Sequence, residues 1–297
     1  MIEGKNGRFD KQVKELADLN KVALVYSLAC GHEAKDLTAR YQLMMDTLAE
    51  ISTLFNSNGI KYSIFKTIKP FPTTPSDIDV LLSQEVFGKA QSLLLSSGYR
   101  KTANDAYSST LEKEMIIDLQ QQPSVSNIPY LPKNLLIENT SVRKINGADV
   151  STLNPEAELL VIASHSLYKE QLFTLNDYYS ITLLAEQIDF SKLVNLAKIA
   201  NVFEALQIVV GLCLQITESV FGNGLRICEL ARLIQAQKGG RVYTMPVKFP
   251  FSLVIRALIN RASKDKEMRQ KMLPAILRIA KPGQLFKLLS HLTRRTY

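Results

Sequence analysis

Apolar side chains recur at steps of three and four residues between Leu37 and Phe55, which is the spacing of one face of an α-helix. The segment Asn56-Ser57-Asn58-Gly59 comes next, and small polar residues followed by glycine predict the end of the helix and a turn. A short apolar run at residues 62–66 then predicts a strand, and the proline- and threonine-rich residues 70–75 predict a loop.

Two further strands are predicted downstream, at residues 78–82 and 115–119, because both runs are short and rich in Ile, Val and Leu. Between them, residues 87–97 predict a helix that Gly98 closes. Residues 141–150 predict a hairpin that turns at an Asn-Gly pair. The first half of the chain therefore mixes strands and helices.

The pattern becomes helical after Asn154. The sequence Asn154-Pro155-Glu156 is typical of a helix start, because it combines a capping side chain, a proline at the first helical position and an acid in the first turn. Helical spacing then recurs in four segments, at residues 157–167, 177–187, 191–200 and 202–221. Breaks at residues 222–224, 239–240 and 246–250 precede or separate short basic helices.

The predicted fold class is therefore α/β (α+β), with a small mixed β-sheet and flanking helices, followed by a helical domain and a basic C-terminal helical extension. The predicted organisation is an N-terminal segment (1–35), an α/β domain (36–153), a helical domain (154–222) and a basic extension (223–297).

Composition supports a folded globular chain. Of the 297 residues, 46% are hydrophobic and 22% are charged. The three cysteines are far apart, which excludes a disulfide scaffold, and we expect them to be small buried apolar side chains. The first ten residues have no apolar core, and the apolar run at residues 206–216 is shorter than the roughly 18 residues of a membrane span. We therefore expect a cytoplasmic protein with no transmembrane segment.

Charge is distributed unevenly along the chain. The net charge is +8, but residues 226–297 hold 16 basic and 3 acidic residues, a net of +13, so the remainder is net acidic. Such a segment attracts polyanions such as RNA or an anionic membrane surface, or it is simply a solvated basic face. Near its end, Leu285, Leu288, Leu289 and Leu292 recur at helical spacing. This stripe predicts a helix that lies on a membrane or partner, or that packs on the protein's own body.

Two carboxylates open the predicted strand at residues 78–82. Side chains alternate along a strand, so Asp77 and Asp79 share one face while Ile78 points to the core. Asp118 lies near the end of the next predicted strand, and it reaches the same rim if the two strands are neighbours. Oxygen ligands of this kind suit Mg²⁺, and three of them could hold two metal ions for attack on a phosphate. We expect Asp79→Asn to abolish Mg²⁺-dependent nucleotide binding and to leave the fold intact, because the clustered charges repel one another.

Residues 60–119 resemble the nucleotidyltransferase superfamily, which has the polymerase-β-like fold, and more narrowly the uncharacterised type 5 nucleotidyltransferase family of bacteria and archaea. The matching parts are Tyr62-Ser63-Ile64-Phe65-Lys66, the motif Ser76-Asp77-Ile78-Asp79-Val80-Leu81-Leu82, the helix end Leu95-Ser96-Ser97-Gly98-Tyr99, and the strand that carries Asp118. Residues 155–184, with His165 and Asp177, are similar to the family's second half. The resemblance implies a metal-dependent transfer of a nucleotidyl group from an NTP and a helical domain that closes over the cleft.

The sequence departs from the family where the first strand ends. Family members usually have Gly-Ser or Gly-Gly there, whose backbone amides hold the NTP phosphates, whereas this chain has Lys66-Thr67, followed by Lys69. Lys66 could supply a positive charge to a triphosphate, and Thr67 or Ser76 a hydroxyl. The alternative is that the two lysines are surface residues on a loop.

Three other groups of residues are weaker candidates. His165 lies on an apolar helix, where it is either packed or facing the cleft. Cys30-Gly31-His32 has residue types that bind zinc but no partner pair. Tyr178-Tyr179 could stack a base or belong to the core.

The favoured function is Mg²⁺-dependent transfer of a nucleoside monophosphate from an NTP, such as ATP, to a hydroxyl acceptor. Asp77, Asp79 and Asp118 would bind metal, Asp118 would also help to deprotonate the acceptor, and Lys66, Thr67 and Ser76 would contact the nucleotide. One alternative is a catalytically inactive protein of the same fold that binds RNA or ribonucleoprotein through its basic C-terminal region. Another is an enzyme that acts on a small hydroxyl-bearing acceptor or a sugar, with a tail that docks on an anionic membrane.

Overall fold

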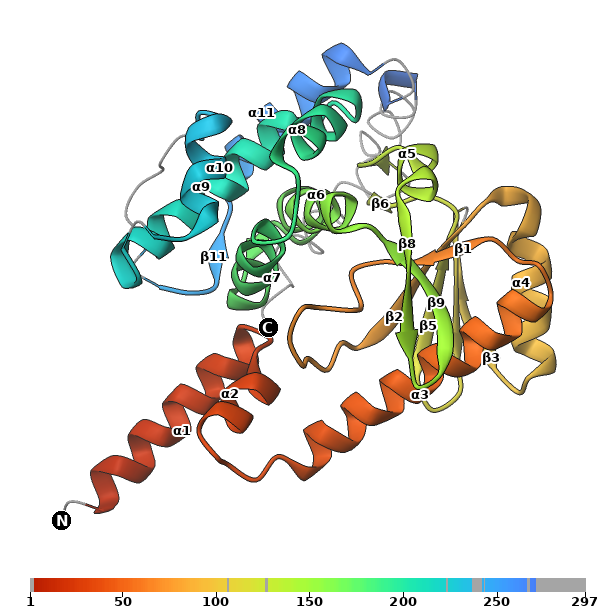
Figure 1. Cartoon of the computed structure of the whole chain (residues 1–297), viewed down its shortest axis with the longest axis horizontal. Helices are drawn as coiled ribbons and strands as arrows, with labels where there is room; N and C mark the ends of the chain where they lie inside the picture. The colour runs from red at the N-terminus through yellow and green to blue at the C-terminus, as the bar shows by residue number, and fades with distance from the viewer. Residues whose placement is uncertain are drawn as a thin grey trace, which may run out of the picture.

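The computed structural model describes residues 3–105, 107–125, 128–222, 224–236, 242, 244–265 and 268–270. Its central element is a mixed sheet of seven strands in the order β3-β4-β5-β2-β1-β9-β8 (Figure 1). The strands are β1 (Tyr62–Ile64), β2 (Asp77–Leu82), β3 (Arg100–Asn104), β4 (Ser108–Glu112), β5 (Ile116–Gln120), β8 (Thr140–Ile145) and β9 (Ala148–Leu153). Two pairs, β2 with β5 and β1 with β9, are parallel, and the other neighbours are antiparallel.

Helices account for most of the remaining described elements. They are α1 (Glu3–Leu19), α2 (Ala23–Ala29), α3 (Lys35–Ser57), α4 (Gln84–Ser96), α5 (Lys133–Glu138), α6 (Pro155–His165), the π-helix η1 (Ser166–Glu170), α7 (Leu175–Ala185), α8 (Phe190–Ile199), α9 (Phe203–Val220), α10 (Arg226–Leu233) and α11 (Phe251–Lys264). Two small two-stranded sheets pair β6 (Ser124–Val125) with β7 (Ile128–Pro129) and β10 (Leu172–Phe173) with β11 (Val247–Lys248). The predicted fold class, a mixed sheet with flanking helices followed by helices, is confirmed.

The sheet has one face that packs in a core and one face that presents polar groups. Ile78, Val80 and Leu82 of β2 alternate onto the first face, where they are buried with the apolar stripe of α3 and with α4. The intervening residues Asp77 and Asp79 therefore lie on the second face. The same alternation in β5 buries its apolar residues with those of β2 and leaves Asp118 on the polar face.

Local sequence signals explain where several elements end. Helix α3 stops at Ser57, and Gly59 has a φ of 66°, as the turn predicted at this point requires. The hairpin β8–β9 turns at Asn146 and Gly147, whose φ values are 44° and 83°, the combination that two-residue hairpins use. Asn154 caps α6 by accepting a hydrogen bond from the Ala157 amide at 2.9 Å.

The sequence indicated no strand between β2 and the strand that carries Asp118, but the structure has two there. The hairpin of β3 and β4 comes between them in the chain, yet β5 lies directly beside β2. Every residue of β3 is exposed, so this edge strand lacks the apolar alternation that would reveal it. The expected neighbourhood of the two aspartate strands is nevertheless present.

The helices after β9 build a second hydrophobic core around α6, which is buried along nearly its whole length. In Figure 1, helices α6 to α11 gather apart from α3 and α4. Within the described residues, α9 is the one helix long and apolar enough to cross a membrane, with a mean hydropathy of 1.3. Half of this 18-residue window is buried in the structure, and the core helix of a folded domain has the same composition. The helix predicted at residues 202–221 is therefore confirmed, whereas the sequence had been judged for a membrane span only on its apolar run at residues 206–216.

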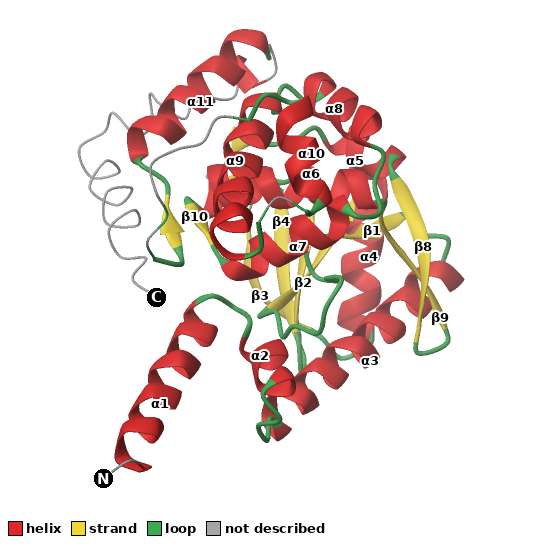
Figure 2. Ribbon diagram, turned by 60° about the vertical axis from the view of Figure 1, so that its left-hand side comes forward, coloured by secondary structure: helices red, strands yellow, loops and turns green. Residues whose placement is uncertain are grey.

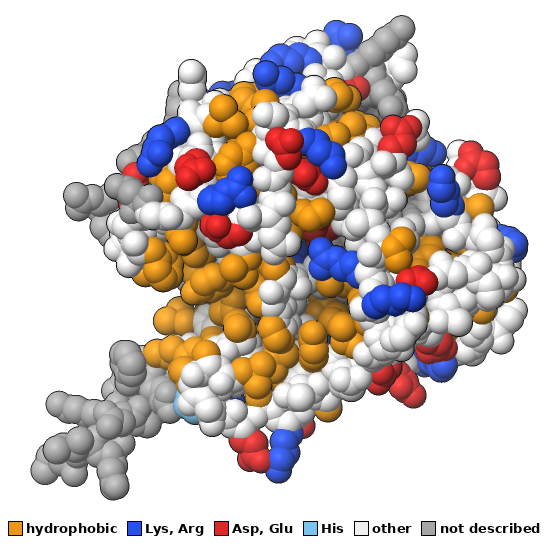
Figure 3. Space-filling view, in the orientation of Figure 1, with side chains coloured by type: hydrophobic (Ala, Val, Ile, Leu, Met, Phe, Trp, Pro, Cys, Tyr) orange, Lys and Arg blue, Asp and Glu red, His pale blue; other side chains and the backbone are white. Residues whose placement is uncertain are grey.

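The N-terminal helices form an arm beside this body. Figure 2 shows α1 projecting outward, with α2 at its base next to α3. An apolar cavity of about 560 Å³ lies where these helices meet α7 and the loop that carries Phe71. Figure 3 shows hydrophobic side chains gathered in a hollow on this side of the molecule. The predicted boundaries at residues 35, 153 and 222 remain predictions.

Candidate active site

Three carboxylates converge on the polar face of the sheet. Strands β2 and β5 run parallel in a register that places Asp79 directly opposite Asp118. Asp77 precedes Asp79 by two residues and shares its face. One carboxylate oxygen from each of the three lies within 4.8 Å of the others. Within the described residues, this is the one group of three acidic, histidine or cysteine side chains close enough to hold a metal ion.

Lys66 places its ammonium group inside this cluster. Its Nζ is 3.0 Å from Asp79 Oδ1, and both side chains are about nine-tenths buried. Burial opposes the charge on Lys66, but Asp79, Tyr130 and Asp77 together outweigh that effect, so the pKa of Lys66 is raised. The reading of Lys66 as a surface residue is therefore wrong. Its φ of 60° is in the left-handed region, which glycine adopts without strain.

This ion pair changes what we expect of Asp79. Asparagine at position 79 would leave the Lys66 ammonium buried without its anionic partner, which typically costs about 3–5 kcal/mol. We therefore expect Asp79→Asn to destabilise the fold, contrary to the expectation from the sequence.

Gln120 bridges two of the three carboxylates, and the sequence analysis missed it. Its Nε2 donates to Asp79 Oδ1 at 2.5 Å and to Asp118 Oδ2 at 2.7 Å. It follows Asp118 by two residues in β5, so strand alternation alone would have placed it on the same face. Thr110 of β4 also donates to Asp118 Oδ1, at 3.4 Å.

The site perturbs the acidity of its carboxylates. Burial, reinforced by the neighbouring charge of Asp79, raises the pKa of Asp118 to about 6. Burial also raises the pKa of Asp79, although Lys66 opposes this shift. A carboxyl group with a pKa near 6 changes charge close to neutral pH, which is a property of groups that accept and donate protons in catalysis.

The hydroxyl groups of Thr67 and Ser76 each form a hydrogen bond with one of the aspartates. The Thr67 hydroxyl is buried, accepts a hydrogen bond from the Asp79 amide at 3.0 Å and donates to the Phe65 carbonyl at 3.3 Å. The Ser76 hydroxyl donates to Asp77 Oδ1 at 2.7 Å. Both hydroxyls therefore position the carboxylates that they adjoin.

Helix α6 is tied to the turn after β1 through Glu158. The Lys66 amide donates to both carboxylate oxygens of Glu158, at 2.9 and 3.2 Å, and Lys69 Nζ lies 3.9 Å from one of them. Burial raises the pKa of Glu158, and Lys69 opposes that shift. A buried acid near the start of α6 thus fixes the backbone on which Lys66 sits.

His165, at the end of α6, is packed in a polar chain. Its Nδ1 is 3.1 Å from the Tyr130 hydroxyl, and its Nε2 is 3.3 Å from Glu170 Oε1. Burial lowers the pKa of His165 well below its ordinary value, so the ring is neutral at neutral pH. Because a carboxylate only accepts, Nε2 carries the proton toward Glu170 and Nδ1 accepts from Tyr130. Asp177, the other residue of the resemblance, completes a capping box with Thr174 at the start of α7.

The remaining candidates lie away from the carboxylate cluster. Cys30 is exposed, contrary to the expectation for all three cysteines, whereas Cys213 and Cys228 are buried. Tyr178 belongs to the core and shares a hydrogen bond of 3.0 Å with Thr217, while Tyr179 is partly exposed.

Part of the basic C-terminal region is outside the described residues. The leucine stripe at residues 285–292 falls there, so the prediction that it docks or packs stays a prediction. The predicted break at residues 239–240 also lies outside the described residues, whereas α10 and α11 confirm short helices in this region.

A mixed sheet with flanking helices that presents three carboxylates from two neighbouring parallel strands agrees with the resemblance to the nucleotidyltransferase superfamily. Residues 73–218 match the profile of a family described as uncharacterised nucleotidyltransferase, so this part of the chain belongs to that family. The match contains Asp77, Asp79, Asp118 and His165, and it begins downstream of Lys66.

Solved structures that are similar to part of this chain include three proteins. ANT(2")-Ia in complex with adenylyl-2"-tobramycin is 13% identical, with a TM-score of 0.41 over 53% of this chain and 96% of that chain. The lincosamide antibiotic adenylyltransferase LnuA, bound to lincomycin, is 18% identical, with a TM-score of 0.35 over 46% of this chain and 92% of that chain. An antigenic nucleotidyltransferase-like protein from Paracoccidioides brasiliensis is 12% identical, with a TM-score of 0.34 over 65% and 93%. No curated protein matches the chain.

Proposed function

We propose that this protein transfers a nucleoside monophosphate from an NTP to a hydroxyl acceptor, in a reaction that depends on Mg²⁺. The observation that carries the proposal is the convergence of three carboxylates from β2 and β5, with an oxygen of each within 4.8 Å of the others. Three oxygen ligands on one sheet face fit Mg²⁺, which keeps water or phosphate oxygens in its other positions. Asp77, Asp79 and Asp118 would hold the metal, which supplies charge stabilisation to the phosphate oxygens.

The protein's own residues have distinct parts in this reaction. The acceptor oxygen attacks the α-phosphorus of the NTP, the bond to the bridging oxygen breaks and pyrophosphate leaves. Asp118 would help to accept the proton from the acceptor hydroxyl, and its pKa of about 6 in the metal-free cluster means that it is ionised at neutral pH. Lys66 exchanges its contact with Asp79 for a contact with the NTP phosphates. Thr67 and Ser76 hold the backbone and side chain of the adjoining aspartates, and they would lie next to the bound nucleotide.

The test is transfer of label from α-labelled NTPs in the presence of Mg²⁺, with total cellular RNA, protein and small-metabolite fractions as acceptors. Asp77→Asn is the informative variant, because Asp77 would be a metal ligand but takes no part in the buried ion pair between Lys66 and Asp79. Asp149→Asn is the matched control, since this exposed carboxylate of β9 forms a surface ion pair with Lys144. Label that appears in one fraction, disappears with Asp77→Asn and persists with Asp149→Asn supports the proposal. Equal labelling by all three proteins contradicts it.

One observation favours the second candidate, an inactive protein of the same fold. The Lys66 ammonium already neutralises Asp79, as a bound cation would. Titration calorimetry separates the two candidates. ATP binding that requires Mg²⁺ supports the enzyme, whereas no ATP binding, together with RNA binding by the intact protein, supports the inactive fold. The predicted RNA or membrane contact of residues 226–297 would show as binding that weakens steeply with salt.

A further inference from the structure

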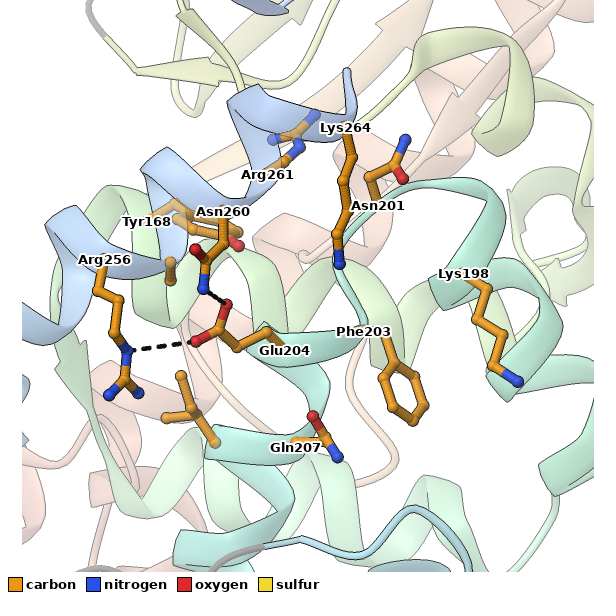
Figure 4. Close-up of a pocket in the computed structure, with 12 residues that line it drawn as sticks. Tyr168, Lys198, Asn201, Phe203, Glu204, Gln207, Arg256, Asn260, Arg261 and Lys264 are labelled. Carbon is orange, nitrogen blue, oxygen red and sulfur yellow. Dashed lines mark hydrogen bonds and ion pairs between the residues drawn. The ribbon is translucent and has the colours of Figure 1, made fainter.

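A polar pocket of about 610 Å³ lies in the helical part of the protein, away from the three aspartates. Its walls come from α8, α9, α11 and the π-helix η1 (Figure 4). None of its lining residues belongs to the carboxylate cluster. Its volume is in the range of pockets that enclose small ligands, about 300–1,000 Å³.

The lining of this pocket is strongly basic. Lys198, Arg256, Arg261 and Lys264 contribute four positive charges, and two carboxylates, Glu204 and Asp265, offset two of them. Glu204 is engaged with the pocket wall, because its two oxygens contact Arg256 Nε at 3.4 Å and Asn260 Nδ2 at 2.9 Å (Figure 4). Positive charge therefore exceeds negative charge in a concave site, which concentrates the field on an anionic ligand.

Arg261 gives the pocket wall a buried cation. Only 3% of this residue is exposed, and its Nη2 lies 3.5 Å from Oδ2 of Asp265, the C-cap of α11. Its guanidinium is 5.9 Å from the ring of Tyr168, which lines the pocket from η1. A buried arginine between an acid and an aromatic ring has a fixed position, so it can orient a ligand instead of only attracting it.

Aromatic rings complete the chemistry of the site. Phe203 and Tyr168 both line the pocket, and Lys198 Nζ lies 5.7 Å over the Phe203 ring. Amide side chains, among them Asn201 and Asn260, also line the pocket. One cavity therefore contains cations that can bind a phosphate and aromatic rings that can pack on a flat group. It also contains amides that can form hydrogen bonds with hydroxyl groups.

We propose that this pocket binds a small phosphate monoester that carries a ring, such as a sugar phosphate or nucleoside monophosphate. Lys198 and Lys264 hold the phosphate, Arg256 stays paired with Glu204, and Tyr168 and Phe203 contact the ring. The site is separate from the proposed catalytic centre and does not depend on it. The π-helix η1 supplies Tyr168 to this pocket, and its Glu170 contacts His165 at the end of α6. Helical turns of this type often occur at functional sites.

The absence of tryptophan from the sequence offers a direct assay. Phe203→Trp places a single tryptophan in the pocket wall, so its fluorescence reports on this site alone. Ribose 5-phosphate and AMP are expected to change the emission and to bind at least tenfold more tightly than ribose and adenosine. When added to the Phe203→Trp protein, Lys198→Met and Lys264→Met are each expected to weaken binding of ribose 5-phosphate and AMP about tenfold.

Two controls keep the result specific. Lys101→Met removes the same charge from the exposed edge strand β3 and is expected to leave binding unchanged. Asp77→Asn alters the carboxylate cluster and is also expected to leave it unchanged, which distinguishes this pocket from the NTP site. If the tryptophan variant does not fold, titration calorimetry with ribose 5-phosphate on the native chain and the two lysine variants makes the same comparison. Equal affinity for ribose and ribose 5-phosphate, no effect of either lysine, or tighter binding of a 5′-phosphorylated oligonucleotide would overturn the proposal.

Discussion

Replacing Asp118 with asparagine should stabilise the metal-free protein at alkaline pH. Asp118 lies opposite Asp79 on the adjacent strand, and burial with this like charge raises its pKa to about 6. A carboxyl group whose pKa is raised on folding binds its proton more tightly in the folded state than in the unfolded chain. The resulting penalty is absent below the unfolded pKa of 3.8, grows as pH rises, and is complete above about pH 6.

The magnitude follows from the difference between these two pKa values. The shift corresponds to about 3 kcal/mol of lost stability at pH 8 and about 0.5 kcal/mol at pH 4. Asparagine keeps an oxygen that can accept from Gln120, but the neutral hydrogen bond is weaker than the present one by about 1 kcal/mol. We therefore expect Asp118→Asn to raise the free energy of unfolding by about 2 kcal/mol at pH 8 and to change it little at pH 4.

Urea denaturation followed by circular dichroism, at pH 4, 6 and 8 with EDTA present, measures this effect. Asp149→Asn is the control, because this carboxylate is 54% exposed in a surface ion pair and should change stability by less than about 0.5 kcal/mol. Added Mg²⁺ should stabilise the native protein more than the Asp118 variant, since ligand binding to the folded state adds to stability. A variant that is less stable at pH 8, or whose gain is the same at all three pH values, would refute the electrostatic explanation.

The site leads to two further predictions. Mg²⁺-dependent ATP binding, measured by calorimetry, should weaken as pH falls through about 6, because protonation of Asp118 removes a metal ligand; unchanged affinity between pH 7 and pH 5 would contradict this. Thr67→Val should lower the urea midpoint by an amount equivalent to about 1–2 kcal/mol, because the buried Asp79 amide loses its acceptor, whereas Thr67→Ser should retain the native midpoint; equal behaviour of the two variants would exclude a role for the hydroxyl.

The chemistry of the cluster could be predicted because it depends on strand periodicity. Asp77, Ile78 and Asp79 alternate in sequence as they do in the sheet, and the apolar residues on either side of Asp118 identify its strand. The Asn154 cap and the Asn-Gly turn could be predicted for the same reason, because each is determined by a few residues next to one another in the sequence. Each of these features is set by residues within a few positions of one another.

Other features depend on contacts between distant parts of the chain. The edge strand β3 is exposed at every position, so the sequence carries no apolar alternation there, and it is a strand only because it pairs with β4. The buried acid Glu158 reads as an ordinary first-turn residue of a helix, although its function is to bind the Lys66 amide, 92 positions earlier. Interactions of this kind become visible only when the helical domain and the sheet are placed together.

Lys66 shows how one unusual position affects both structure and function. A lysine in the left-handed region costs about 1–2 kcal/mol relative to a glycine, so it persists where other contacts offset that strain. Here the backbone is held by two bonds to Glu158 and the side chain by the ion pair with Asp79. The same ion pair stabilises the cluster when no metal is bound, and a metal ion must compete with it. The affinity for Mg²⁺ should therefore depend on whether an arriving phosphate offers Lys66 a second anion, which would make metal and nucleotide bind together rather than in sequence.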